Sequence, residues 1–163
     1  MADTIFLPRL TAISQCLCES LAAAGTDNPC FCGLVGGEGA PAELLLACGD
    51  KDCVIAWVRM GGITPIPSTN GDATGFTPCS PPLVAQCEIG IVRCFAAVDE
   101  DATMASPAEF LAATQQQSDD MALMLKAITC CLPSKRDINV AGWLPIGTDG
   151  NVLGGAWEFE LYG

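Results

Sequence analysis

The sequence predicts an α+β fold in which a mainly antiparallel sheet packs against two helices and ends in a C-terminal hairpin. Three observations lead to this prediction. Apolar residues recur at helical spacing in two segments, two other segments are apolar enough to be strands, and an Asp-Gly pair separates two strand-like segments near the C-terminus. The chain has 163 residues, which fits a single domain over residues 1–163.

The first helix is predicted over residues 8–24. Proline suits the first helical turn, where its missing N–H would have no partner, and Gly25 suits the stop. The segment that follows, residues 26–52, is rich in glycine, proline and cysteine, and we expect it to be mostly loop. One face of the helix is apolar, with Leu10, Ile13, Leu17 and Leu21 three to four residues apart.

Residues 53–60 and 83–98 are predicted as strands. Both faces of the first are largely apolar, which is typical of a strand covered on both sides. In the second, we expect Gly90 to mark a bulge or a bend.

Residues 61–82 are predicted to form a long loop. They contain five prolines and four glycines, a composition that disfavours both helices and interior strands. Long ordered loops usually take part in binding or assembly. We therefore expect this loop to contact another subunit, with Pro65, Pro67 and Phe76 as candidate interface residues.

The second helix is predicted to begin after Ser106, because Ser106-Pro107-Ala108-Glu109 combines an N-cap serine, a proline at the first helical position and a glutamate three residues after the cap. Apolar residues then follow one face until Pro133 ends the helix. We expect the polar residues 115–120 to face water.

Residues 140–146 and 152–162 are predicted to form a hairpin around Asp149-Gly150, a dipeptide typical of tight turns. The second strand alternates apolar and polar residues, so the hairpin should have one apolar face. Trp157 and Phe159 lie on that face and are candidate interface residues.

Charge and composition exclude several functions. Seven Lys and Arg against nineteen Asp and Glu give a formal net charge of -12, which repels nucleic-acid phosphates and anionic membranes. The chain contains no histidine, the commonest general base and metal ligand. The apolar stretch at 83–98 is shorter than the roughly 20 residues of a membrane-spanning helix. We expect a soluble, non-enzymatic protein without a cofactor, a membrane partner or a targeting segment.

The eleven cysteines admit several interpretations, and their odd number leaves at least one without an internal partner. A zinc site in the region of residues 30–53 is one alternative, although the spacings only partly match structural zinc sites. Disulfides would be unusual in a reducing cytoplasm and reasonable in a particle outside the cell. We expect Cys87 and Cys94 to be small buried residues. The candidate disulfide cysteines are Cys16, Cys18, Cys30, Cys32, Cys48, Cys53, Cys130 and Cys131.

Three short motifs resemble a known family. They are Ile89-Gly90-Ile91-Val92-Arg93-Cys94, the run from Met121-Ala122-Leu123 through Cys130-Cys131, and Trp143-Leu144-Pro145 before Gly154-Gly155-Ala156-Trp157. From about residue 53 onward the chain resembles tail-terminator or head-to-tail connector proteins of long-tailed (siphovirus) bacteriophages of actinobacteria.

This resemblance implies a virion protein of the phage neck, assembled in the host cytoplasm. Such a subunit forms a ring, usually of six copies, that terminates the tail tube and presents a docking face to the head-side connector or stopper protein. DNA would pass through the ring without being read, and an acidic lumen would let it slide. We expect the contacts between copies at the long loop and at the outer edge of the terminal hairpin. The alternatives are a stopper or adaptor of the same neck, or a cysteine-rich metal-binding module.

Overall fold

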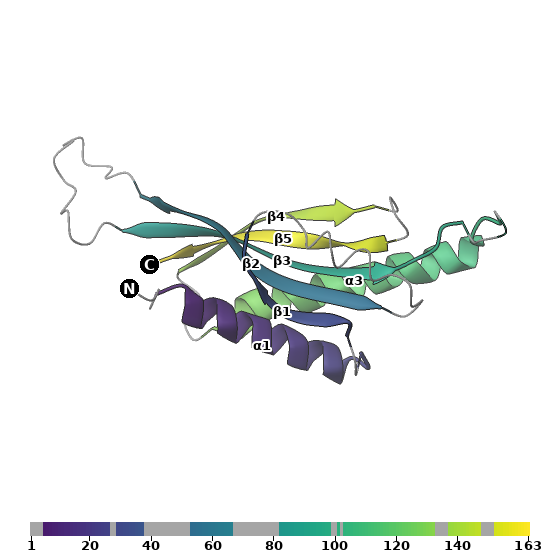
Figure 1. Cartoon of the computed structure of the whole chain (residues 1–163), viewed down its shortest axis with the longest axis horizontal. Coiled ribbons are helices and arrows are strands. Elements are labelled where there is room, and N and C mark those ends of the chain that lie inside the picture. The colour runs from purple at the N-terminus through teal and green to yellow at the C-terminus, as the bar shows by residue number, and fades with distance from the viewer. Residues whose placement is uncertain are drawn as a thin grey trace.

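The computed structural model describes residues 5–26, 29–37, 53–66, 82–98, 101, 103–132, 137–147 and 152–163. Its five strands form one sheet in the order β1-β2-β3-β5-β4 (Figure 1). Neighbouring strands are antiparallel except for the parallel pair β1–β2, so the predicted α+β class with two helices and a mainly antiparallel sheet is confirmed. In chain order the elements are α1 (Leu7–Ala23), β1 (Phe31–Val35), β2 (Val54–Pro65), β3 (Leu83–Cys94), α3 (Pro107–Cys130), β4 (Ile138–Ile146) and β5 (Val152–Tyr162).

The main core lies between the two helices and one face of the sheet. Alternate residues of the three inner strands, such as Val58, Ile89 and Phe159, join buried residues of both helices in one apolar cluster. The opposite face of the same strands carries a smaller cluster that contains Ile55 and Trp57. The long inner strands therefore have apolar residues on both faces, as the sequence of residues 53–60 predicts.

Helix α1 ends as its sequence predicts. Gly25 adopts a positive φ of 91°, which residues with a side chain rarely adopt. Its N–H donates to the carbonyl of Ala22, and the N–H of Thr26 donates to the carbonyl of Leu21. These two bonds form a Schellman motif, and they satisfy carbonyl groups that the last helical turn leaves without partners.

Helix α3 begins with the predicted capping box. The Ser106 hydroxyl accepts the backbone N–H of Glu109, and the Glu109 carboxylate accepts the backbone N–H of Ser106. The buried residues of this helix, Asp120, Met124, Ala127 and Ile128, all lie in its second half.

The expectation that residues 115–120 face water is wrong at Asp120. Its side chain is buried, and it accepts two hydrogen bonds from the guanidinium of Arg93, at 2.6 and 2.8 Å. Gln116 also donates to Asp120, and Gln117 donates to the carbonyl of Gly154. The side chain of Asp120 is 4% exposed and that of Arg93 is 23% exposed, so loss of Arg93 would leave a buried carboxylate without its charged partner, and this pair fixes α3 to β3.

The bulge expected at Gly90 is also wrong. Gly90 pairs in regular register with Trp57 on one side and Ala156 on the other. The register shifts lie elsewhere, between Met60 and Gly62 of β2 and between Val140 and Gly142 of β4. Gly90 instead makes room for an aromatic ring, since a Cβ at this position would overlap the Trp57 side chain.

Three predicted boundaries need correction. Strand β1 lies inside residues 26–52, which the composition assigned to loop, and it is parallel to β2. Strand β2 continues through residues 61–65, because the glycines lie in the bulge and Pro65 is its last residue. Strand β3 ends at Cys94, although residues 83–98 were expected to form one strand. Most of the predicted Pro-rich loop and the Asp149-Gly150 turn lie outside the described residues.

Candidate functional site

The two edges of the sheet are the first candidate surface. Of the described strands, β1 and β4 each have one neighbour, and they lie on opposite sides of the sheet. Neither strand contains a charged residue, although the chain as a whole carries 26. Each exposes a leucine: Leu34 of β1 is 37% exposed, and Leu144 of β4 is 47% exposed. Charged side chains are one of the features that keep edge strands from pairing with another chain, and neither β1 nor β4 has one. Strand β4 does contain two other such features, Pro145 and the bulge at Ala141.

The sheet face opposite the helices carries a row of charged residues. Arg59, Glu88 and Glu158 are direct neighbours across β2, β3 and β5. One Glu88 oxygen accepts from the Arg59 guanidinium at 2.7 Å, and the other accepts from the Trp57 indole N–H at 2.7 Å. These bonds compensate for the like charge of Glu158, which lies directly opposite Glu88.

A groove of about 480 Å³ lies along this row. The bulged positions Gly61 of β2 and Ala141 of β4 line it, together with Glu158 and Glu160. Bulges increase the local twist of a sheet, and here they occur at the same level on both sides of the β3–β5 pair. The groove is thus acidic, because Glu88 already binds its one arginine.

Hydrogen bonds also keep the groove negatively charged. The Tyr162 hydroxyl donates to the Glu160 carboxylate at 2.7 Å, and the Asn139 amide donates to the same oxygen at 3.1 Å. Both bonds favour the ionised form, so they lower the pKa of Glu160. The same bond from Tyr162 raises the pKa of its hydroxyl. Carboxylates placed in this way repel phosphate.

Three disulfides join described residues to one another, and they link the two helices, α1 and β1, and the strands β1 and β2. Cys16–Cys131 joins α1 to the end of α3, Cys18–Cys32 joins α1 to β1, and Cys30–Cys53 brings together the starts of β1 and β2. Cys16 and Cys18 project in different directions from α1, and each therefore has a different partner. These bonds occupy Cys30, Cys32 and Cys53, which the zinc alternative would have needed as thiolates.

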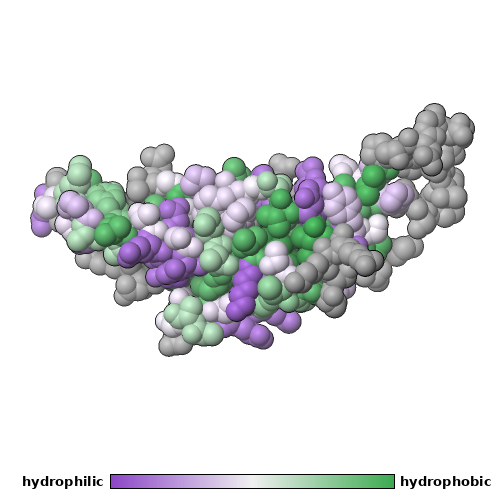
Figure 2. All heavy atoms as spheres, turned by 180° about the vertical axis from the view of Figure 1, so that it is seen from behind, coloured by the Kyte–Doolittle hydropathy of each residue, from purple (hydrophilic) through white to green (hydrophobic). Residues whose placement is uncertain are grey.

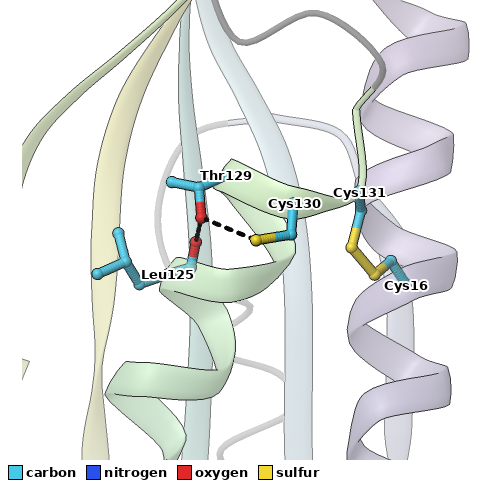
Figure 3. Close-up of a disulfide and its surroundings, with 5 residues drawn as sticks. All are labelled: Cys16, Leu125, Thr129, Cys130 and Cys131. Atoms are coloured by element: carbon cyan, nitrogen blue, oxygen red, sulfur yellow. Dashed lines mark hydrogen bonds between the residues drawn. A yellow bond between two sulfur atoms is a disulfide. The ribbon is translucent and has the colours of Figure 1, made fainter.

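Cys130 does not form a disulfide, although it was a candidate. It is free and exposed, and its sulfur lies 3.6 Å from the Thr129 hydroxyl oxygen. Figure 3 shows this sulfur pointing away from the neighbouring Cys16–Cys131 bond. Cys48, the remaining candidate, lies outside the described residues.

Cys87 and Cys94 differ, although both were expected to be small buried residues. Cys94 is disulfide-bonded. Cys87 is free and buried, and its burial raises the pKa of the thiol to about 12. The Cys87 thiol therefore stays protonated at neutral pH, whereas a nucleophilic cysteine must be a thiolate.

The candidate interface residues differ in how far they are buried. Phe159 is fully buried in the main core, so its assignment to an interface is wrong. Trp157 is half-buried, packs against Trp143 with ring centroids 5.5 Å apart, and donates its indole N–H to the Met121 carbonyl. Pro65 is exposed at the end of β2, and Pro67 and Phe76 lie outside the described residues.

The acidic groove and the uncharged β1 edge were not predicted. The alternation of Glu158 and Glu160 in β5 indicates which face they occupy, but the two bulges that form the groove depend on strand pairing. The absence of charge along β4 is visible in the sequence, and it is the strongest signal for an edge contact.

The described residues contain no group of three or more Cys, Asp or Glu arranged to hold a metal ion. None of the described helices is both long enough and apolar enough to span a membrane. No protein-family model and no curated protein matches the sequence.

Proposed function

We propose that this chain is a structural virion protein of the phage neck, one subunit of a closed ring that terminates the tail tube and joins the tail to the head connector. The observation that supports the ring is the pair of uncharged edge strands, β1 and β4, on opposite sides of the sheet that the described strands form. Two different edges that fit each other make a head-to-tail contact, which closes into a ring where the rotation between copies allows it and otherwise extends as a filament.

The strand directions are compatible with this contact. Strand β1 is parallel to β2, β2 and β5 are both antiparallel to β3, and β4 is antiparallel to β5. Strand β4 therefore runs opposite to β1. A copy placed beside β4 in the same orientation would offer its β1 as an antiparallel neighbour, and main-chain hydrogen bonds would continue the sheet.

The acidic face supports the role in DNA passage. Glu88, Glu158 and Glu160 occupy the side of the sheet opposite the helices. If this face lines the ring, the channel repels DNA and lets it slide, whereas a basic channel would hold it.

The assignment to a phage neck comes from the three motifs that resemble tail terminators. They fall on β3, on the second half of α3 and on the β4–β5 hairpin, which pack against one another as β3–β5, β4–β5 and α3–β5 neighbours. Binding of the purified oligomer to tail-tube protein tests this part. Binding to portal-side protein alone would instead indicate a stopper or adaptor.

Charge placed on one edge at a time tests the contact between copies. We expect Leu144→Lys on β4 and Leu34→Lys on β1 each to abolish the oligomer, because each buries a charge at the contact. An exposed helix position provides the control, and Ala122→Lys should leave the oligomer intact. Native mass spectrometry gives the mass of each species.

A mixture of the two edge variants makes the test specific. Each variant keeps one intact edge, so a head-to-tail contact predicts one-to-one dimers that cannot extend. If Leu34→Lys alone still forms dimers, the contact is β4 with β4, and no ring of this kind exists. If Leu144→Lys keeps the wild-type mass, β4 is not an assembly edge.

A further inference from the structure

The N-terminal half of α3 projects from the molecule. No side chain of residues 107–119 is buried, whereas the second half of the helix packs into the core. Figure 1 shows this half extending past the ends of the strands. We call this end of the molecule, residues 95–98 and 103–119, the tip.

The tip contains the two most exposed large hydrophobic residues of the described chain. Met104 is 72% exposed and Leu111 61% exposed, the two highest values among the exposed large hydrophobic residues, and Val98 is 47% exposed. The same end, at the left of Figure 2, shows hydrophobic residues interspersed with hydrophilic ones. Three of the eight exposed large hydrophobic residues of the described chain therefore lie in the tip, and such concentrations are a feature of sites that bind other molecules.

Local interactions hold the tip in one arrangement. Val98 and Met104 form a β-bridge, and the N–H of Ala105 donates to the carbonyl of Ala97 at 2.9 Å. The Phe95 and Phe110 rings lie edge to face, with centroids 5.2 Å apart. The capping box at Ser106 satisfies the first helical N–H groups. The exposed residues therefore occupy a formed surface and not a frayed helix end.

The charges around the tip indicate the chemistry of the partner. Asp101, Glu109 and Asp119 are exposed acidic residues at its border or within it. A matching surface is apolar with positive charge at its rim.

Among the described residues, a second copy of the chain offers one exposed cation outside an ion pair, Lys126. The three described arginines form ion pairs within their own subunit: Arg9–Asp137, Arg59–Glu88 and Arg93–Asp120. The whole chain has only seven Lys and Arg against nineteen acids, so two copies repel each other outside their uncharged edges.

We propose that the tip binds an apolar, positively charged segment of a different protein. This binding surface is separate from β1 and β4, and it stands whether or not the ring of the proposed function forms. Leu111 and Met104 supply the apolar contact, and the surrounding carboxylates orient the cationic segment.

The test uses a fluorescent amphipathic peptide of leucine and lysine, with a leucine and glutamate peptide of the same pattern as its counterpart. Fluorescence anisotropy at about 0.15 M salt measures binding to the full-length protein. We expect the lysine peptide to bind and the glutamate peptide not to bind. The double variant Met104→Ser/Leu111→Ser keeps every charge and should bind about tenfold more weakly or worse.

Two further variants separate specific docking from general attraction to an acidic protein. Ile63→Ser removes another exposed apolar residue, at the end of β2, and should bind like wild type. Glu109→Gln keeps the side-chain length that the capping box uses but removes the charge, and it should weaken binding in a salt-dependent manner.

Equal binding by wild type and Met104→Ser/Leu111→Ser would overturn the proposal, as would equal binding of both peptides. A change in the native mass of Met104→Ser/Leu111→Ser would also overturn it, because the tip would then contact a second copy. Circular dichroism of each variant checks that the fold is retained.

Discussion

Gly90 and Trp57 are neighbours across β3 and β2, and the absence of a side chain at Gly90 decides how the sheet packs there. The Trp57 ring occupies the position that a Cβ would take, and its indole N–H reaches the Glu88 carboxylate. The ring is thus fully buried on a face that also carries the acidic groove. A single glycine allows this arrangement of a large apolar ring beside a row of charges.

Replacement of Gly90 with alanine should destabilise the protein by roughly 1–3 kcal/mol or more, because the added methyl group overlaps the ring in a close-packed core. Gly62→Ala is the matched control, since a Cβ there meets no atom within 4 Å. Urea unfolding of the oxidised proteins measures both. Equal stability of the two variants would show that Trp57 moves without cost.

Cys87 and Cys130 should differ sharply in reactivity. Burial raises the pKa of Cys87 to about 12, from an ordinary value of 9.0. Between pH 9 and pH 12 the Cys87 thiol is deprotonated in the unfolded chain but protonated in the folded one. The stability that its burial contributes is therefore complete below pH 9. It is lost as the pH rises toward 12, at about 1.4 kcal/mol of unfolding free energy per pH unit.

Alkylation at pH 8.5 with peptide mapping checks this expectation. Cys130 is exposed and should be modified, whereas Cys87 should react only after denaturation. Modification of Cys87 at the rate of Cys130 in the native protein would contradict its burial.

The buried ion pair shows where sequence patterns fail at the residue scale. Asp120 lies in the polar run 115–120, which has the composition of a solvent-facing helix surface. Its burial depends on Arg93 of β3, which lies 27 residues earlier in the sequence. Patterns within a helix involve residues only three or four positions apart, so they do not predict this contact. Phe159 was misassigned for a related reason, since an apolar strand residue can face a core or a partner.

At the scale of elements, the helix ends could be predicted from nearby residues in the sequence, whereas the strands depend on which other strands they pair with. The ends of α1 and α3 depend on their own caps, Gly25 and Ser106, and both were predicted. Strand β1 has only five residues, includes a cysteine and a glycine, and depends on β2 and on Cys32 for its place. Its existence could not be predicted from its composition.

The cap of α3 should control local stability because no core packing supports the first half of the helix. Ser106→Ala should cost about 1 kcal/mol and speed hydrogen exchange in the first turns about fivefold. Ser118→Ala, on the same helix but away from the cap, is the matched control and should leave exchange unchanged. Equal exchange in both variants would mean that contacts other than the cap hold this end.

At the scale of the whole molecule, charge and edges together favour assembly through the sheet. The described arginines neutralise acids of their own subunit, which leaves an acidic exterior. Copies with such surfaces repel each other unless they meet where charge is absent, and β1 and β4 are two such places. The Cys18–Cys32 disulfide ties the β1 edge to α1, and Cys16–Cys131 ties α1 to the end of α3.

The composition and the C-terminal hairpin were sufficient to predict one of these edges. The outer edge of the terminal hairpin, which was predicted to contact another copy, is the edge strand β4. The other side was assigned to the Pro-rich loop, most of which lies outside the described residues, while the open edge opposite β4 belongs to β1. The sheet order determines that edge, and it depends on all five strands.

The native mass of the purified full-length chain tests the central claim most directly. Native mass spectrometry without reductant should show one discrete species of about six copies of the 16.9 kDa chain, stable on dilution. A monomer at every concentration, or an open-ended series of sizes, would contradict the closed ring.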